Sequence, residues 1–94
     1  MCRPVKTQAF GYDSVATVLR NGKVRVIVYT RDHPPAHVHI VAPEGHAKIL
    51  VDGPNGLPTL AWNLGLSKRQ LAWALSTVYE SREMIMVVWN RIHE

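Results

Sequence analysis

Residues 14–30 read SVATVLRNGKVRVIVYT, and this stretch predicts a β-hairpin. Residues 15–19 are a run of small, aliphatic and β-branched side chains, and residues 23–30 alternate. In that alternation, one face of the strand carries Val24, Val26 and Val28. The other face carries Arg25, Ile27 and Tyr29. Asn21-Gly22 lies between the two runs, and Asn-Gly suits a type I′ turn because both central residues need positive φ. Residues 14–30 are therefore predicted to form the first antiparallel pair of strands.

Two further strands are predicted after the hairpin. Pro34-Pro35 does not fit a central strand, so residues 31–35 are expected to form an ordered, extended loop. Residues 36–41 form the third predicted strand, in which the imidazoles at positions 37 and 39 point away from the aliphatic side chains at 38 and 40. A turn at residues 43–45 and a strand at residues 46–51 complete a four-stranded antiparallel meander.

The C-terminal part predicts two helices. Pro58 suits the first turn of a short helix that ends near Leu64, with Gly65 as the residue after it. Ser67 and Gln70 have the spacing of a capping box, so a second helix is expected from Lys68 to about Ile92. One buried stripe has the spacing of that helix: Leu71, Leu75, Val78, Ile85, Trp89 and Ile92.

The predicted fold class is α+β. One small, mainly antiparallel four-stranded sheet packs on a short helix and a long C-terminal helix. The chain is read as a single domain over residues 1–94, with an extension at 1–13, the sheet at 14–52 and the helices at 58–92. The side chains expected to face the long helix are Val24, Val26, Val28, Val38, Ile40 and Ile49.

Composition narrows the class of protein. Hydrophobic residues make up 47% of the 94 residues and charged residues 19%, which excludes a disordered chain. No apolar run approaches the roughly 20 residues that span a bilayer. The start lacks the apolar core of a secretory signal, and Cys2 is the one cysteine. These features predict a cytoplasmic protein. The net charge of +4 fits either an ordinary basic protein or a surface for nucleic acid or an acidic partner.

The candidate chemistry lies in residues 32–39, which read DHPPAHVH. His37 and His39 are two residues apart on a strand, so both imidazoles leave one face about 7 Å apart. The stiff proline pair limits where His33 can lie, and Asp32 is able to orient an imidazole through its second N–H. We expect the three histidines to converge on one solvent-reachable pocket with Asp32 at its edge.

Several chemistries fit these residues. In the first, His33, His37 and His39 act with Asp32 as general acids and bases on RNA, and Arg25, Arg31 and Lys48 bind the phosphate. In the second, the three histidines bind a metal, although no second Cys/His cluster supports it. A nucleotide-hydrolase histidine triad requires a third histidine where Val41 stands. In the last, the histidines only organise their loop. No cofactor is predicted.

Two interaction surfaces are also candidates. Ala61, Gly65 and Leu71 have the spacing of a helix–turn–helix, whose second helix would begin with Lys68, Arg69 and Gln70. A corner between two helices that does not bind DNA needs the same small residues. Residues 84–89 read MIMVVW and leave no polar face. They either wedge into the core or contact a second copy or another protein through Met84, Val87 and Val88.

The segment Asp32-His33-Pro34-Pro35-Ala36-His37-Val38-His39 resembles the uncharacterised bacterial family called domain of unknown function 4160. Further similarities lie at residues 17–20, 47–49, 61–63, 65–67, 69, 71 and 89–90. The resemblance implies a small protein encoded beside another, in an arrangement like a toxin–antitoxin pair. It implies no established activity. The preferred interpretation is a partner-binding member of such a pair with an RNA-directed histidine site. The alternatives are a DNA-binding regulator and a metal-binding module.

Overall fold

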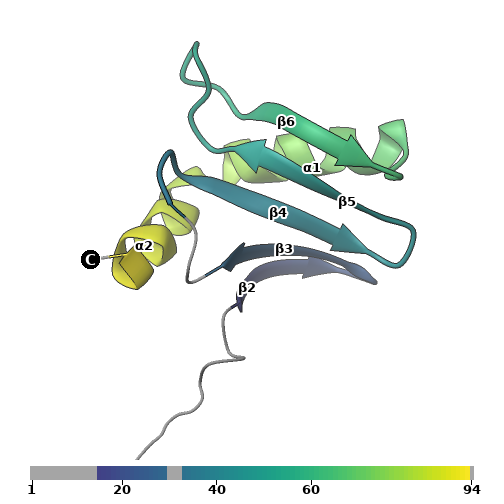
Figure 1. Ribbon diagram of the computed structural model, residues 1–94, viewed down its shortest axis with the longest axis horizontal. Coiled ribbons are helices and arrows are strands. Elements are labelled where there is room, and N and C mark those ends of the chain that lie inside the picture. The colour runs from purple at the N-terminus through teal and green to yellow at the C-terminus, as the bar shows by residue number, and fades with distance from the viewer. Residues whose placement is uncertain (1–14, 30–32, 94) are drawn as a thin grey trace, which may run out of the picture.

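The computed structural model describes residues 15–29 and 33–93, which form a five-stranded antiparallel sheet and two helices (Figure 1). The strands are β2 (Val15–Asn21), β3 (Val24–Tyr29), β4 (His37–Ala42), β5 (Gly45–Leu50) and β6 (Thr59–Leu64). Each strand pairs with the next one along the chain, so β4 is central and β2 and β6 are the edges. The predicted α+β class is confirmed. The predicted N-terminal extension, Arg31 and Asp32 lie outside the described residues.

The hairpin of β2 and β3 is confirmed, with its turn one residue later than predicted. Asn21 pairs with Val24, so the two loop residues are Gly22 and Lys23 rather than Asn21 and Gly22. Gly22 has φ +62°, which glycine adopts at no steric cost. The glycine therefore still occupies a position that needs positive φ.

The sheet core follows the predicted alternation. Val26 on β3 lies opposite Ile40 on β4, and Ile40 lies opposite Ala47 on β5. All three side chains are fully buried. Five of the six side chains expected to face a helix are completely buried, and Val24 packs against the same core from a partly buried position. The predicted register of the sheet is therefore confirmed for these strands.

The fifth strand corrects the prediction of a short helix over residues 58–64. Residues 59–64 form β6, which pairs with β5. A six-residue helix gains few hydrogen bonds after its costly first turn, whereas β5 would otherwise leave a row of backbone groups without partners. Thr59 and Trp62 also suit a strand better than a helix. The prediction of four strands was wrong for this reason.

The predicted long helix is present as two helices. Helix α1 (Lys68–Glu80) and helix α2 (Arg82–His93) meet at Ser81, which has φ −105° and ψ 16°. The Ser81 N–H donates to the Thr77 carbonyl, and the Ile85 N–H donates to the Ser81 carbonyl, so hydrogen bonding continues across the break. In the described part of the chain, neither helix is long and apolar enough to cross a membrane.

The start of α1 is confirmed in detail. The Gln70 N–H donates to the Ser67 hydroxyl oxygen at 3.1 Å, and the Ser67 N–H donates to the Gln70 side-chain oxygen at 2.9 Å. This reciprocal capping box satisfies two backbone donors that helix geometry leaves unpaired.

The two helices take different places around the sheet. Helix α1 lies behind one face, and α2 lies at the end of the sheet where β3 finishes and β4 begins (Figure 1). Of the predicted helical stripe, Val78, Ile85 and Trp89 are buried, and the remaining three pack against the core from partly buried positions: Leu71, Leu75 and Ile92. On the sheet face away from α1, helix α2 contacts His37 through Trp89, with ring centroids 5.2 Å apart.

Two glycines bring the turn between β4 and β5 against the connection between β6 and α1. A Cβ added at Gly45 would lie 2.5 Å from the Leu64 carbonyl oxygen, and one added at Gly65 would lie 2.5 Å from the Glu44 carbonyl oxygen. Gly65 also has φ +93°. This backbone-to-backbone contact places the start of α1 behind the sheet.

Replacing Gly65 with alanine tests that contact. We expect Gly65→Ala to lower the free energy of unfolding by about 2 kcal/mol, because an L-residue is strained at positive φ and its Cβ would clash with backbone. Gly56→Ala is the matched control, since Gly56 has φ +73° but no atom within 4 Å of an added Cβ. Urea denaturation measures both, and equal losses would show that the Glu44 contact contributes nothing.

Candidate functional site

The sheet face away from α1 carries a row of polar and aromatic side chains. Ile27 on β3 pairs with His39 on β4, His39 pairs with Lys48 on β5, and Lys48 pairs with Trp62 on β6. Directly paired residues in a sheet point to the same face. The pleat that buries Val26 and Ile40 against the helices therefore places this row on the opposite side.

His39 is the centre of a group of contacting rings. Its ring centroid lies 4.5 Å from that of Tyr29, 5.3 Å from His37, 5.0 Å from His46 and 6.0 Å from Trp62. His46 and Trp62 also touch, with centroids 5.0 Å apart. These distances are typical of edge-to-face and offset contacts between aromatic rings. Strands β3 to β6 each contribute at least one ring.

The same contacts continue from His37 to the loop and to α2. His37 lies 6.5 Å from His33 and 5.2 Å from Trp89, measured between ring centroids. Trp89 stacks on His93 at 3.9 Å with an interplanar angle of 27°. All five histidines of the chain thus belong to one connected set of rings with Tyr29, Trp62 and Trp89. We call this set the histidine cluster.

One hydrogen bond in the cluster joins two imidazoles. Nδ1 of His39 and Nε2 of His46 are 2.9 Å apart, so one nitrogen donates and the other accepts. A single proton lies between the two rings, because two N–H groups would repel each other there. The pair therefore offers a donor and an acceptor held in one place.

The other histidines bond to backbone carbonyls. Nδ1 of His33 donates to the Pro34 carbonyl at 3.0 Å, and Nδ1 of His37 donates to the Pro35 carbonyl at 2.8 Å. A carbonyl only accepts, so Nδ1 carries the proton in both rings. His93 makes the same bond to the Trp89 carbonyl, and its buried Nε2 has no hydrogen-bond partner.

The members of the histidine cluster differ in how far their side chains are exposed to solvent. His37 is 2% exposed and His39 is 9% exposed, whereas His33 is open to solvent. His46 is half-buried and Trp62 is 38% exposed. A ligand on this face therefore meets Trp62 and His46 first, and His39 lies directly behind them.

The structure places the three predicted histidines side by side but gives them different partners. The rings of His33, His37 and His39 contact one another in sequence, while their Nδ1 atoms point to two proline carbonyls and to His46. Their functional role stays a prediction. Asp32, the fourth predicted residue, lies outside the described part of the chain.

Sequence reasoning missed His46 and Trp62 as members of the site. A signal for His46 existed, because the predicted turn at residues 43–45 folds the strand after it back along the strand of His39. Trp62 was hidden because residues 58–64 were assigned to a helix. Only pairing with β5 brings its indole to the histidine face.

The predicted cations divide between two sides of the molecule. Lys48 pairs with His39, and Arg25 pairs with Val41, which in turn pairs with His46. Arg20 lies opposite Arg25 and adds a third cation. Within the described ranges, none of these three cations forms an ion pair. Arg31 lies outside those ranges.

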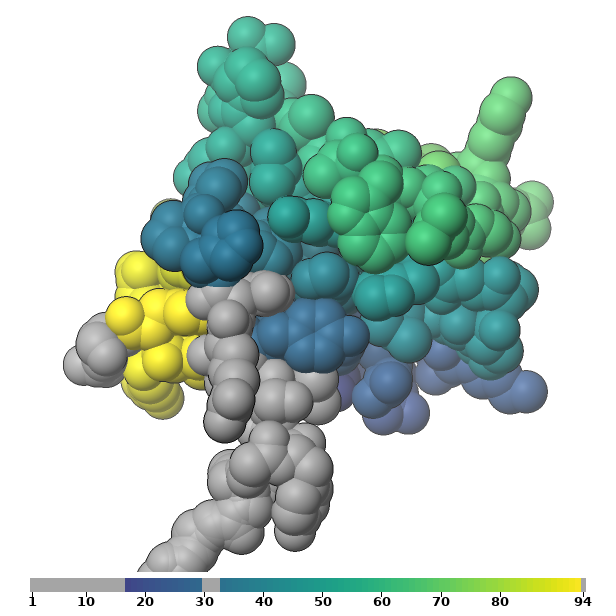
Figure 2. Space-filling view, in the orientation of Figure 1, coloured from purple at the N-terminus to yellow at the C-terminus, as the bar shows by residue number. Residues whose placement is uncertain are grey.

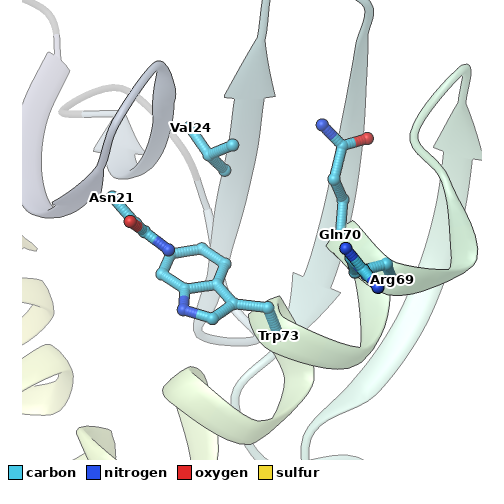
Figure 3. Close-up of a pocket in the computed structure, with 5 residues that line it drawn as sticks. All are labelled: Asn21, Val24, Arg69, Gln70 and Trp73. Carbon is cyan, nitrogen blue, oxygen red and sulfur yellow. The ribbon is translucent and has the colours of Figure 1, made fainter.

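The remaining predicted nucleic-acid residues begin α1, behind the sheet. Arg69 and Gln70 border a pocket of about 250 Å³ between the hairpin and the helix, as Figure 3 shows. Its other lining residues are Asn21, Val24 and Trp73. Lys68 precedes them at the first helical position. These three residues are therefore separated from the histidine cluster by the sheet.

The helix–turn–helix interpretation of Ala61, Gly65 and Leu71 is wrong. Ala61 lies in strand β6, so the first helix of the motif does not exist. Gly65 turns the chain from a strand into α1 rather than from one helix into another.

A metal site gains no support from the residues that the structure describes. Among residues 15–29 and 33–93, no three or more His, Cys, Asp or Glu side chains are grouped so that they could hold an ion. The histidine rings form an extended line, whereas zinc requires its ligands to converge within about 2 Å of one point.

The comparisons with known proteins identify the family. The family model for domain of unknown function 4160 matches residues 24–90, which include β3 to β6 and most of both helices. No curated protein matches the chain. No solved structure matches it either. Because the matched segment is well over half of the 94 residues, the chain belongs to the family called domain of unknown function 4160.

Proposed function

We propose that the histidine cluster is an RNA-directed site that binds single-stranded RNA. The observation that carries this proposal is a sheet face on which contacting rings, partly exposed at Trp62, His46 and Tyr29, lie beside cations that form no ion pair within residues 15–29 and 33–93. The space-filling view shows that the side chains of β4, β5 and β6 make up much of this face (Figure 2). Four-stranded sheets of other proteins bind RNA by stacking its bases on aromatic rings of an open face.

The exposed rings supply the base contacts in this proposal. Trp62 is 38% exposed, and Tyr29 and His46 are half-buried, so part of each ring is open to a ligand. Stacking of one base on an aromatic side chain is worth about 1–3 kcal/mol and tolerates any sequence. Unstacked bases are available in single strands and loops, which favours these over a duplex.

The neighbouring cations supply the phosphate contacts. Arg20 and Arg25 are cross-strand neighbours, and Lys48 pairs with His39. Like charges directly opposite each other destabilise a sheet, so an anion between Arg20 and Arg25 would relieve their repulsion. The net charge of +4 favours such an anion as well.

The His39–His46 hydrogen bond favours a second function, cleavage of the bound RNA. In this reaction the ribose 2′-oxygen attacks the phosphorus, and one imidazole takes the hydroxyl proton. The bond from phosphorus to the 5′-oxygen breaks, and the other imidazole, which begins the reaction as an imidazolium, gives that oxygen a proton. A 2′,3′-cyclic phosphate and a 5′-hydroxyl result. Proton transfer between the two rings then restores the starting state.

A toxin–antitoxin-like role adds a protein partner to this proposal. Met84 is 42% exposed and Val87 is 54% exposed on α2, whereas Val88 packs against the core. These residues remain the predicted contact of α2 with a second copy or a partner protein. An exposed pair of large apolar side chains is a modest signal for an interface.

The salt dependence of RNA binding tests the binding proposal. The affinity for a single-stranded oligonucleotide should fall as salt rises, and Lys48→Gln should reduce the slope of log affinity against log salt by about 0.7. Fluorescence anisotropy over a salt series measures this slope. Lys68→Gln is the matched control, since Lys68 is a cation on the far side of the sheet. Absence of binding at low salt, or equal effects of both variants, would contradict the proposal.

Cleavage is tested at the half-buried member of the imidazole pair. His46→Gln should slow cleavage of a labelled RNA at least about 100-fold while changing its affinity only a few-fold, because glutamine does not exchange the proton. His93→Gln is the control, since His93 lies at the other end of the cluster. A 2′-O-methyl group at the cut site should block the reaction. Full activity of His46→Gln would exclude the acid–base role.

The α2 surface is tested by a charge substitution. Val87→Glu should dissociate the assembly, since an unpaired carboxylate buried in an interface costs about 3–5 kcal/mol. Sedimentation velocity should then change from an oligomer to a monomer. The exposed α1 position in Ala72→Glu serves as the control. A wild-type protein that sediments as a monomer across a concentration series would argue against this interface.

A further inference from the structure

Strand β6 is an edge of the sheet with no described strand on its outer side. The sheet order ends at β6, which pairs only with β5 among the described strands. An edge strand presents a row of backbone N–H and C=O groups that are able to pair with another chain.

The side chains of β6 do not protect this edge. Leu60, Trp62 and Leu64 are 37%, 38% and 67% exposed. The strand TLAWNL contains no charged residue and no proline, which are the usual means of blocking an edge. Both its backbone and its side chains therefore favour contact with a further strand.

We propose that β6 binds an extended, acidic segment of another protein as a sixth strand of the sheet. In this mode of recognition, backbone hydrogen bonds provide affinity and alternate side chains provide specificity. Trp62 and Leu64 pair with Lys48 and His46, so they lie on the histidine face and would contact alternate side chains of the added strand. Leu60 pairs with Ile49 and would contact a side chain on the other face of that strand. This surface is separate from the Met84 and Val87 surface of α2.

The charges around β6 define the chemistry of its partner. Lys68 follows the strand, and Lys48 lies on the adjacent strand. Before the strand, the Arg82 guanidinium donates to the Gly56 carbonyl at 3.2 Å. Of the acidic residues, Asp52 lies in the connection between β5 and β6, and Glu44 belongs to the turn whose backbone contacts Gly65. Three cations against these two acidic residues favour an acidic segment. A second copy of this chain, with its own charge of +4, fits less well.

The added strand would also affect the histidine face. The indole of Trp62 belongs to β6 and contacts both His39 and His46. A strand bound along β6 would cover part of this indole. If the proposed RNA site exists, the partner and RNA therefore compete for Trp62, and the partner is an inhibitor of RNA binding. This last step alone rests on the proposed function.

The test uses a synthetic peptide of alternating valine and threonine with two glutamates at each end. Isothermal titration should detect its binding to the full chain without RNA. Leu64→Glu should weaken binding at least about tenfold, because it removes an apolar contact and repels the glutamates. Ala72→Glu is the matched control: it adds the same charge at an exposed position on α1, away from both proposed surfaces. Methylation of alternate peptide nitrogens should abolish binding.

The outcomes separate the possible occupants of β6. Loss of binding by Leu64→Glu and by the methylated peptide, with binding by Ala72→Glu unchanged, supports the proposal. The proposal is overturned if the peptide does not bind at about 1 mM, because its binding free energy is then weaker than about 4 kcal/mol. A lysine-flanked peptide that binds with the same affinity would also overturn the proposal. A wild-type dimer that Leu64→Glu dissociates would overturn it too. Circular dichroism checks folding, and Leu60→Glu replaces Leu64→Glu if that variant is unfolded.

The RNA step has a separate readout. Anisotropy with labelled RNA should show that the peptide displaces RNA from the wild type but not from Leu64→Glu. RNA that never binds leaves the titration result intact and removes only the competition. RNA and peptide that bind together without mutual effect would refute the competition while strand addition stands.

Discussion

The hydrogen bonding of β4 on both sides is the constraint on which the rest of the structure depends. Its neighbours β3 and β5 fix the register, so Val38 and Ile40 point to the helices while His37 and His39 point to the opposite face. A slip by one residue would exchange the two sets. Imidazoles would then replace aliphatic side chains in a core with few polar partners, at a cost of several kcal/mol. The register that folds the sheet is therefore also the register that forms the histidine face.

Fixing β4 also determines which side chains meet His39. The turn between β4 and β5 brings His46 back within hydrogen-bonding distance, and β6 adds Trp62 from the far side of β5. The contact of Gly45 with the Leu64 carbonyl joins that turn to the end of β6. The site thus rests on regular strands, which hold side chains more firmly than loops do. Only His33 belongs to a loop.

The parts of the fold that local chemistry determines could be predicted from the sequence. Alternation gave the faces of β3 and β4, and the spacing of Ser67 and Gln70 gave the start of α1. Residues 59–64 could not be assigned this way, because a six-residue apolar segment suits a helix or a strand equally well. The open edge of β5 decides between them, and that edge is a property of the assembled sheet. The break at Ser81 has no glycine or proline to mark it.

The same non-local pairing explains why the site was predicted only in part. His37 and His39 follow from the strand period, but their hydrogen-bond partners lie on other elements or in the loop before β4. The Pro35 carbonyl accepts from His37, and His46 forms a hydrogen bond with His39. Sequence spacing predicts which face a side chain occupies, whereas its protonation state depends on the partner that folding supplies. The chemistry of a histidine-rich segment therefore cannot be deduced before its neighbouring strands are placed.

The position of Trp62 joins the two proposed surfaces. Its indole contacts His39 and His46 on the face of the sheet, and its backbone lies in the edge strand. One side chain is unable to stack fully on a base and be covered by an added strand at the same time. By linkage, a partner that weakens RNA binding through Trp62 must itself be weakened by RNA to the same extent. An inhibitor placed on β6 would thus act without entering the histidine cluster, because the sheet edge and the cluster share this residue.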